Sequence, residues 1–133
     1  MAYVMVVDDD ADFANVVATV LRRDGHEVAI RLDTKSALAD MEKRRPDAIV
    51  LDVMFPEDES AGFVLARGIR SREDALKDVP ILILTAINAK FPLGFSAQDI
   101  DDQWLPVSDF LEKPVDFEIL RGKVAKMLGK AGG

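Results

Sequence analysis

The sequence predicts an α/β fold with a parallel sheet, and two observations support this class. Short apolar runs rich in Val and Ile recur along the 133 residues, as in strands that are buried on both faces. Between these runs, apolar residues recur at the spacing of helices that pack one side against a core. Because parallel strands need crossover connections, this alternation predicts right-handed βα units within one domain.

The expected strands are apolar runs that are too short to form core helices. Their spacing along the chain leaves room for a helix between consecutive strands. The five runs are Tyr3–Val7, Val28–Ile30, Ala48–Leu51, Ile81–Leu84 and the shorter Phe110–Leu111.

The first two helices have clear boundaries. In the first, apolar residues repeat at i, i+3, i+4, i+7 and i+8 from Phe13, with Asp10 as the N-cap and Gly25 just past the end. The second is expected to be capped by Thr34 and to stop before Pro46.

Helical signals weaken in the second half of the chain. A third helix is expected around Leu65–Arg70, although Gly68 inside it costs about 1 kcal/mol relative to alanine. The last helix is expected from about Asp116 to Leu128. We therefore expect a domain at 1–129 and a flexible tail at 130–133.

The composition excludes several function classes. A net charge of −7 without a block of Lys or Arg argues against binding to nucleic acid or to an anionic membrane. The absence of cysteine excludes disulfides, thiolate nucleophiles and Cys-ligated zinc. The longest apolar stretch, Pro80 to Ile87, is too short to span a bilayer, and no signal peptide is visible. A cytoplasmic domain is expected.

Polar residues whose side chains could bind a ligand or take part in a reaction lie at the carboxyl ends of the expected strands, where open α/β sheets bind ligands. Three or four carboxylates, a hydroxyl and an ammonium group would meet at this edge. They are Asp8, Asp9 and Asp10 after the first strand, Asp52 after the third, Thr85 at the end of the fourth and Lys113 after the fifth.

Each of these residues, taken alone, also has a purely structural interpretation, since Asp8–Asp10 could simply cap the first helix. The combination favours a ligand. Carboxylates ~4 Å apart repel by about 1–4 kcal/mol per pair at effective dielectric constants of about 80 to 20. An acidic cluster whose ligands are all oxygen atoms favours a hard cation such as Mg²⁺.

Four segments at these strand ends together resemble the signature motifs of response-regulator receiver domains in two-component signalling systems. The resemblance implies a flavodoxin-like sheet of five strands in the order 2-1-3-4-5, with helices on both faces. The segments are Val6-Val7-Asp8-Asp9-Asp10, Leu51-Asp52-Val53-Met54-Phe55-Pro56, Leu84-Thr85-Ala86 and Phe110-Leu111-Glu112-Lys113-Pro114.

The resemblance implies a role for each acidic residue of the site. Asp52 would be the phosphoacceptor, and Asp9 and Asp52 would bind Mg²⁺ directly. The backbone carbonyl of Met54 would be a third ligand, and Asp8 would act through a metal-bound water.

The resemblance also implies a phosphoryl contact and a switch. Lys113 would contact the phosphoryl oxygens, and Thr85 would donate its hydroxyl to one of them. Thr85 and Phe110, which would change rotamer, would form the switch, and the Lys113–Pro114 peptide would be cis. The implied partners are a sensor histidine kinase or phosphotransfer protein and a downstream protein target. Catalysis would be limited to self-phosphorylation and autodephosphorylation.

Two intervals are longer than is usual for such domains. Asp52 and Gly62 lie 10 positions apart, and Thr85 and Lys113 lie 28 positions apart, which indicates a remodelled fourth-helix region within 88–108. An alternative function is therefore a receiver-fold interaction module whose binding does not depend on phosphate. A metal-dependent phosphohydrolase is a weaker alternative, because Met54 stands two residues after Asp52, where one such family would require a second aspartate. No G-x-x-x-x-G-K-[ST] loop occurs either.

Overall fold

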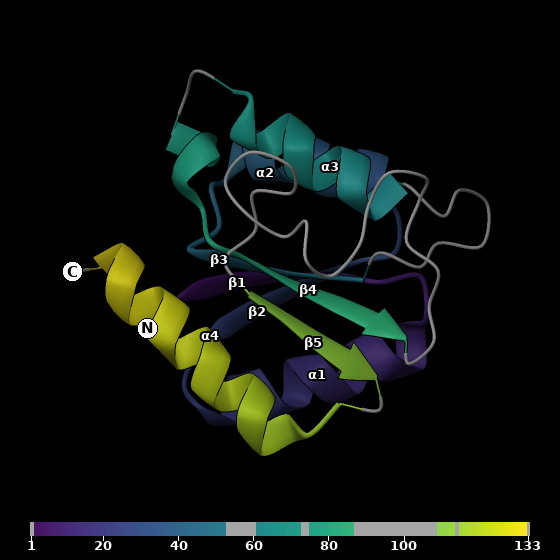
Figure 1. Ribbon diagram of the computed structural model, residues 1–133, viewed down its shortest axis with the longest axis vertical. Helices are drawn as coiled ribbons and strands as arrows, with labels where there is room; N and C mark the ends of the chain where they lie inside the picture. Colours follow the sequence, from purple (N-terminus) through teal and green to yellow (C-terminus); the bar gives the residue numbers. More distant parts are fainter. Residues whose placement is uncertain (1, 53–60, 73–74, 87–108, 114, 133) are drawn as a thin grey trace.

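The computed structural model describes residues 2–52, 61–72, 75–86, 109–113 and 115–132. Strands and helices alternate through most of this part of the chain (Figure 1). In chain order they are β1 (Tyr3–Val7), α1 (Ala11–Arg23), β2 (Glu27–Arg31), α2 (Thr34–Lys43), β3 (Ala48–Asp52), α3 (Ala61–Arg70), the 3₁₀ turn η1 (Ala75–Asp78), β4 (Ile81–Ala86), β5 (Asp109–Lys113) and α4 (Phe117–Gly132).

The strands form one parallel sheet in the order β2-β1-β3-β4-β5. The predicted α/β class with a parallel sheet is therefore confirmed. Every residue of β1 and β3 is buried, as the continuous apolar runs predicted for strands covered on both faces. Strand β1 has β2 on one side and β3 on the other, so the connection from β2 to β3 passes over β1 and the later strands are added on the opposite side. This is a topological switch point, where ligand sites of open α/β sheets occur.

Two hydrophobic clusters sandwich the sheet. One joins α2 and α3 to side chains such as Met5 and Val7, and the other joins α1 and α4 to Val4 and Val6. Alternate residues of a strand point to opposite faces, so β1 contributes to both clusters. Figure 1 shows the result, with α2 and α3 on one side of the sheet and α1 and α4 on the other.

The helix ends test the predicted caps. Asp10 caps α1, since its side chain accepts a hydrogen bond from the Phe13 N–H, as predicted. The predicted cap of α2 was wrong by one residue. Asp33 is the cap, because its extended backbone lets the carboxylate accept from the Ser36 N–H at 2.7 Å, which leaves Thr34 as the first helical residue. These hydrogen bonds lower the pKa of Asp33.

The last helix continues beyond its predicted end at Leu128. It reaches Gly132, so Lys130 and Ala131, both good helix formers, extend it past Gly129. The division into a domain at 1–129 and a tail at 130–133 stays a prediction.

An aromatic contact and a set of charged hydrogen bonds join α4 to α1 and to its C-cap. The rings of Phe13 and Phe117 pack with centroids 6.4 Å apart. Further along, the Arg121 guanidinium donates to both carboxylate oxygens of Asp24, at 2.7–3.1 Å, and to Glu118 at 2.9 Å. The hydrogen bonds from Arg121 lower the pKa of Asp24, so this contact is retained until the pH falls below the ordinary carboxyl range.

The edge strand β2 carries a charged residue at each end, and both residues pair with α2 or its C-cap. Arg31 forms an ion pair with Asp40, and Glu27 forms one with Arg44. The Arg44 guanidinium also lies over the Tyr3 ring, 3.9 Å from its centroid. These pairs connect β2 to α2 and to its C-cap.

Two further features complete the comparison with the sequence. The short turn η1 was not predicted, and the remodelled segment expected within 88–108 lies outside the described residues. None of the helices in the described ranges combines the length and apolar character that a membrane crossing requires.

Gly25 and Gly122 should respond in opposite ways to alanine. Gly25 has a φ of +92° after α1, a conformation that disfavours side chains, so Gly25→Ala should lower the free energy of unfolding by about 1 kcal/mol. Gly122 lies inside α4 with open space around an added Cβ, so Gly122→Ala should raise it by roughly 0.5–1 kcal/mol. Urea denaturation of both variants measures the two signs, and a loss in both would contradict the analysis.

Candidate metal centre at the carboxyl edge of the sheet

The parallel register of two neighbouring strands brings the acidic residues together. Val7 pairs with Leu51, and each is followed by an aspartate, Asp8 after β1 and Asp52 at the end of β3. Because the two strands run in the same direction, both carboxylates lie at the same edge of the sheet. The prediction that these residues converge is thus supported by the strand pairing itself.

The turn from β1 into α1 is held by hydrogen bonds that use two of its three aspartates. The Asp8 N–H donates to the Arg31 carbonyl at 3.0 Å, which prolongs the β1–β2 ladder by one residue. The Asp10 N–H donates to Asp8 Oδ1 at 2.9 Å, and Asp10 caps α1. The structural interpretation is therefore correct for Asp10, and Asp9 lies between two anchored neighbours.

Asp8, Asp9 and Asp52 form the only acidic group of this kind among the described residues. One carboxylate oxygen from each lies within 4.8 Å of those of the other two. Asp8 is 1% exposed and Asp52 is 3% exposed, whereas Asp9 is exposed. The group is therefore open on one side and closed on the other, and two of its carboxylates are largely removed from water.

These three residues fit a divalent cation. Three carboxylates at such distances repel one another by about 1–4 kcal/mol per pair, and burial of two of them reduces screening by solvent. Oxygen atoms are the ligands that Mg²⁺ and Ca²⁺ prefer, and Mg²⁺ is commonly held by few carboxylates, with water filling the remaining positions. The geometry can thus hold a metal ion, and the exposed Asp9 lies on the side open to water.

The other predicted site residues are placed only by their backbone or not at all. Met54 and Pro114 lie outside the described residues. Lys113 is the last residue of β5 and Thr85 the last but one of β4, with Thr85 opposite Glu112 and Ala86 opposite Lys113. Their backbones therefore lie at the same edge of the sheet as the acidic group.

Phe110 lies within β5, opposite Ile83 of β4, and is three residues before Lys113. Asp52 pairs with Leu84, the residue that precedes Thr85. The pairing of β3 with β4 thus brings Thr85 close to the acidic group in register, and the pairing of β4 with β5 continues this connection to β5.

Residues 4–125 match the family of response regulator receiver domains. The fold, the strand order and the acidic group at the switch point agree with this match. The chain belongs to the response regulator receiver domain family.

Two similar proteins are of different kinds, one a sensor kinase/phosphatase and the other a transcriptional regulatory protein. The chain is 30% identical over 122 residues to the CAI-1 autoinducer sensor kinase/phosphatase CqsS of Vibrio cholerae, covering 92% of this chain and 17% of that protein. It is 30% identical over 129 residues to the phosphate regulon transcriptional regulatory protein PhoB of Pseudomonas aeruginosa, covering 97% of this chain and 52% of PhoB. The chain thus spans about half or less of these relatives.

Solved structures support the same fold. A candidate response regulator from Chloroflexus aurantiacus superposes with a TM-score of 0.80 at 30% identity, covering 96% of this chain and 98% of the other.

Removal of one carboxylate should relieve the crowding. Without divalent ions, Asp9→Ala should raise the free energy of unfolding by about 1 kcal/mol or more, because the repulsion of Asp9 by the other two carboxylates disappears. Its affinity for Mg²⁺ should fall by about tenfold or more, since one carboxylate ligand is lost. Urea denaturation in EDTA and calorimetric titration with MgCl₂ measure these effects.

Asp12→Ala is the matched control. Asp12 is an exposed aspartate in the first turn of α1, outside the acidic group, and its removal should leave Mg²⁺ affinity unchanged without any gain in stability. Equal behaviour of the two variants would contradict the metal centre.

Proposed function

We propose that this domain accepts a phosphoryl group on Asp52 from a phosphohistidine of a sensor histidine kinase or phosphotransfer protein. The observation that carries the proposal is the acidic group itself. It joins Asp52 to Asp8 and Asp9 at the switch point of a receiver fold. An isolated aspartate at a strand end would have no such surroundings.

The chemistry requires a carboxylate nucleophile. An Asp52 carboxylate oxygen would attack the phosphorus atom, forming a P–O bond while the P–N bond to the donor imidazole breaks, and the imidazole would take up a proton from water. Phosphoryl transfer through a loose transition state depends on positioning and on charge stabilisation more than on acid–base catalysis. Burial of Asp52 at the end of the rigid strand β3 supports the positioning.

Mg²⁺ is the cofactor that we propose for the acidic group. Asp9 and Asp52 would hold it directly, together with the Met54 carbonyl, and Asp8 would act through water. Bound there, the ion would neutralise charge on the acidic group and on the phosphoryl oxygens. Three carboxylates balanced by a divalent cation and by the ammonium group of Lys113 would give a nearly neutral site, ready for a dianionic group.

Thr85, Phe110 and Lys113 would carry the signal. Lys113 would contact the phosphoryl oxygens as a compact point charge, with its peptide to Pro114 cis, and Thr85 would donate its hydroxyl. Movement of Thr85 toward the phosphoryl group would leave space that the Phe110 side chain could fill. The packing would then have two states, and the charge added by phosphorylation would favour one of them. The adjacent register of β4 and β5 supports this coupling.

The output would be binding to a downstream protein in the cytoplasm rather than turnover of an external substrate. Self-phosphorylation and autodephosphorylation would be the only catalysis. The full-length relatives are a sensor kinase/phosphatase and a transcriptional regulatory protein, so the domain would serve as the phosphorylated input of a larger pathway.

The phosphoacceptor is tested by intact-mass analysis after incubation with acetyl phosphate. Wild-type protein should gain one phosphoryl group with MgCl₂ and none in EDTA. Asp52→Asn should gain none, because the amide is not a nucleophile for this reaction. Asp12→Asn, which removes a nearby exposed carboxylate, should be labelled like wild type. Undiminished labelling of Asp52→Asn would place the phosphate on another residue.

Thr85→Ala should separate phosphorylation from signalling. The variant should still be labelled on Asp52, since the nucleophile and the acidic group are intact. In wild type with Mg²⁺ and beryllofluoride, amide chemical shifts should change from Asp52 across β4 to Phe110, whereas in Thr85→Ala the changes should stay near Asp52. Identical shift patterns in β5 of both proteins would show that Thr85 does not couple the two strands.

A further inference from the structure

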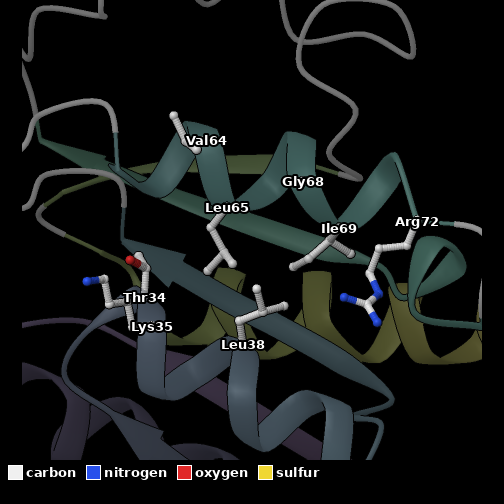
Figure 2. Close-up of a pocket in the computed structure, with 8 residues that line it drawn as sticks. All are labelled: Thr34, Lys35, Leu38, Val64, Leu65, Gly68, Ile69 and Arg72. Atoms are coloured by element: carbon white, nitrogen blue, oxygen red, sulfur yellow. The ribbon is translucent and has the colours of Figure 1, made fainter.

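A groove lies between α2 and α3, on the face of the sheet opposite α1 and α4. It has a volume of about 340 Å³ and is lined from both helices (Figure 2). Its lining residues are Thr34, Lys35 and Leu38 from α2, and Val64, Leu65, Gly68, Ile69 and Arg72 from α3 or just after it.

The floor of this α2–α3 groove is apolar and belongs to the packed core. Leu65 and Ile69 belong to the hydrophobic core, at 6% and 0% exposure, and Leu38 packs against the same core. Val64 stands at the rim with 62% of its surface exposed, the most exposed large hydrophobic residue in the described part of the chain. An apolar surface on a packed floor is a feature of binding sites.

Gly68 keeps the groove open. It lies inside α3, where glycine is less favourable than alanine by about 1 kcal/mol in helix propensity. No described atom lies within 4 Å of a Cβ added at this position, and its φ is not positive, so neither packing nor backbone conformation requires glycine there. A side chain at position 68 would instead project into the space that the groove provides.

The charges of the groove are both positive, although the chain as a whole has a net charge of −7. Lys35 lies at one end and Arg72 at the other, with the leucine and isoleucine side chains between them (Figure 2). Glu42 forms an ion pair with Arg72 at 3.3 Å and offsets its charge, so Lys35 is the cation that a partner carboxylate would meet. No carboxylate lines the groove among the described residues.

We infer that the α2–α3 groove binds an acidic amphipathic segment of a partner protein. Apolar side chains of the segment would cover Leu38, Leu65 and Ile69, and a carboxylate at one end of the segment would meet Lys35. A helix with apolar residues at i, i+3, i+4 and i+7 presents such a face to a groove between helices. The opposite charge at the Lys35 end would fix the direction of the segment along the groove.

Charge complementarity argues against a second copy of this chain as the occupant. In a two-fold symmetric dimer the groove would face itself, which would bring Lys35 and Arg72 close to the same cations of the other copy. Like charges that meet at an interface are unfavourable. The groove shares no residue with the acidic group, so we expect the inferred binding without phosphorylation at Asp52.

The test uses two fluorescent helical peptides of 14 residues as probes. The first has leucine at i, i+3, i+4 and i+7 with glutamate elsewhere on its flanks, and the second has lysine in place of every glutamate. Fluorescence anisotropy should show binding of the glutamate peptide and at least about tenfold weaker binding of the lysine peptide. Amide shift changes should map the glutamate peptide to α2 and α3.

Gly68→Leu is the decisive variant. Its side chain should fill the groove and weaken binding of the glutamate peptide by about tenfold or more, while helix propensity keeps the domain folded. Gly122→Leu is the matched control, since it adds the same side chain at an exposed helical glycine with open space in α4, and it should bind like wild type. Lys35→Glu should also weaken binding, and Lys126→Glu on α4 should not.

Several outcomes would overturn the inference. These are no binding of the glutamate peptide, equal binding of the two peptides, shift changes away from α2 and α3, or full binding by Gly68→Leu. Self-association that Gly68→Leu abolishes, measured by sedimentation, would assign the groove to a second copy instead. Asp52→Asn should retain peptide binding, so a failed phosphorylation test and a failed groove test are distinguishable.

Discussion

The parallel pairing of β1 with β3 is the constraint on which the site depends. It places Asp8 and Asp52 at one edge, where burial brings two like charges together beside Asp9. Such an arrangement is unfavourable in isolation, and two layers of core on either side of the sheet hold it in place. The rigidity of buried strands thus sustains an electrostatic strain that a cation is suited to relieve.

Most of the fold was predictable from the sequence because its signals are local. Continuous apolar runs predicted the strands, and helical spacing predicted α1 with its cap at Asp10. The cap of α2 was misplaced because Asp33 and Thr34 are both good capping residues, and only the extended backbone of Asp33 decides between them. The four-residue turn η1 is too short to show any periodicity.

For the site, the sequence predicted which residues lie together at the carboxyl ends of the strands, but not their burial. Topology predicts that Asp8, Asp9 and Asp52 meet, and helical spacing already identified Asp10 as the cap. The burial of Asp8 and Asp52 beside an exposed Asp9 depends on packing, and only the coordinates show it. The α2–α3 groove had no sequence signal of its own. It arises from the packing of two helices that are separated in the chain by β3, and Gly68 alone indicates only a weak helix former.

The ion pairs along β2 have a consequence for how this domain meets other proteins. A strand at the edge of a sheet offers unpaired backbone groups to which a foreign strand can add. Here Glu27 and Arg31 mark both ends of that edge with charge, and each is held by a group on or just after α2, Arg44 and Asp40. An incoming strand would have to displace or bury these charges, so the edge is protected against β-sheet extension and against the aggregation that follows from it.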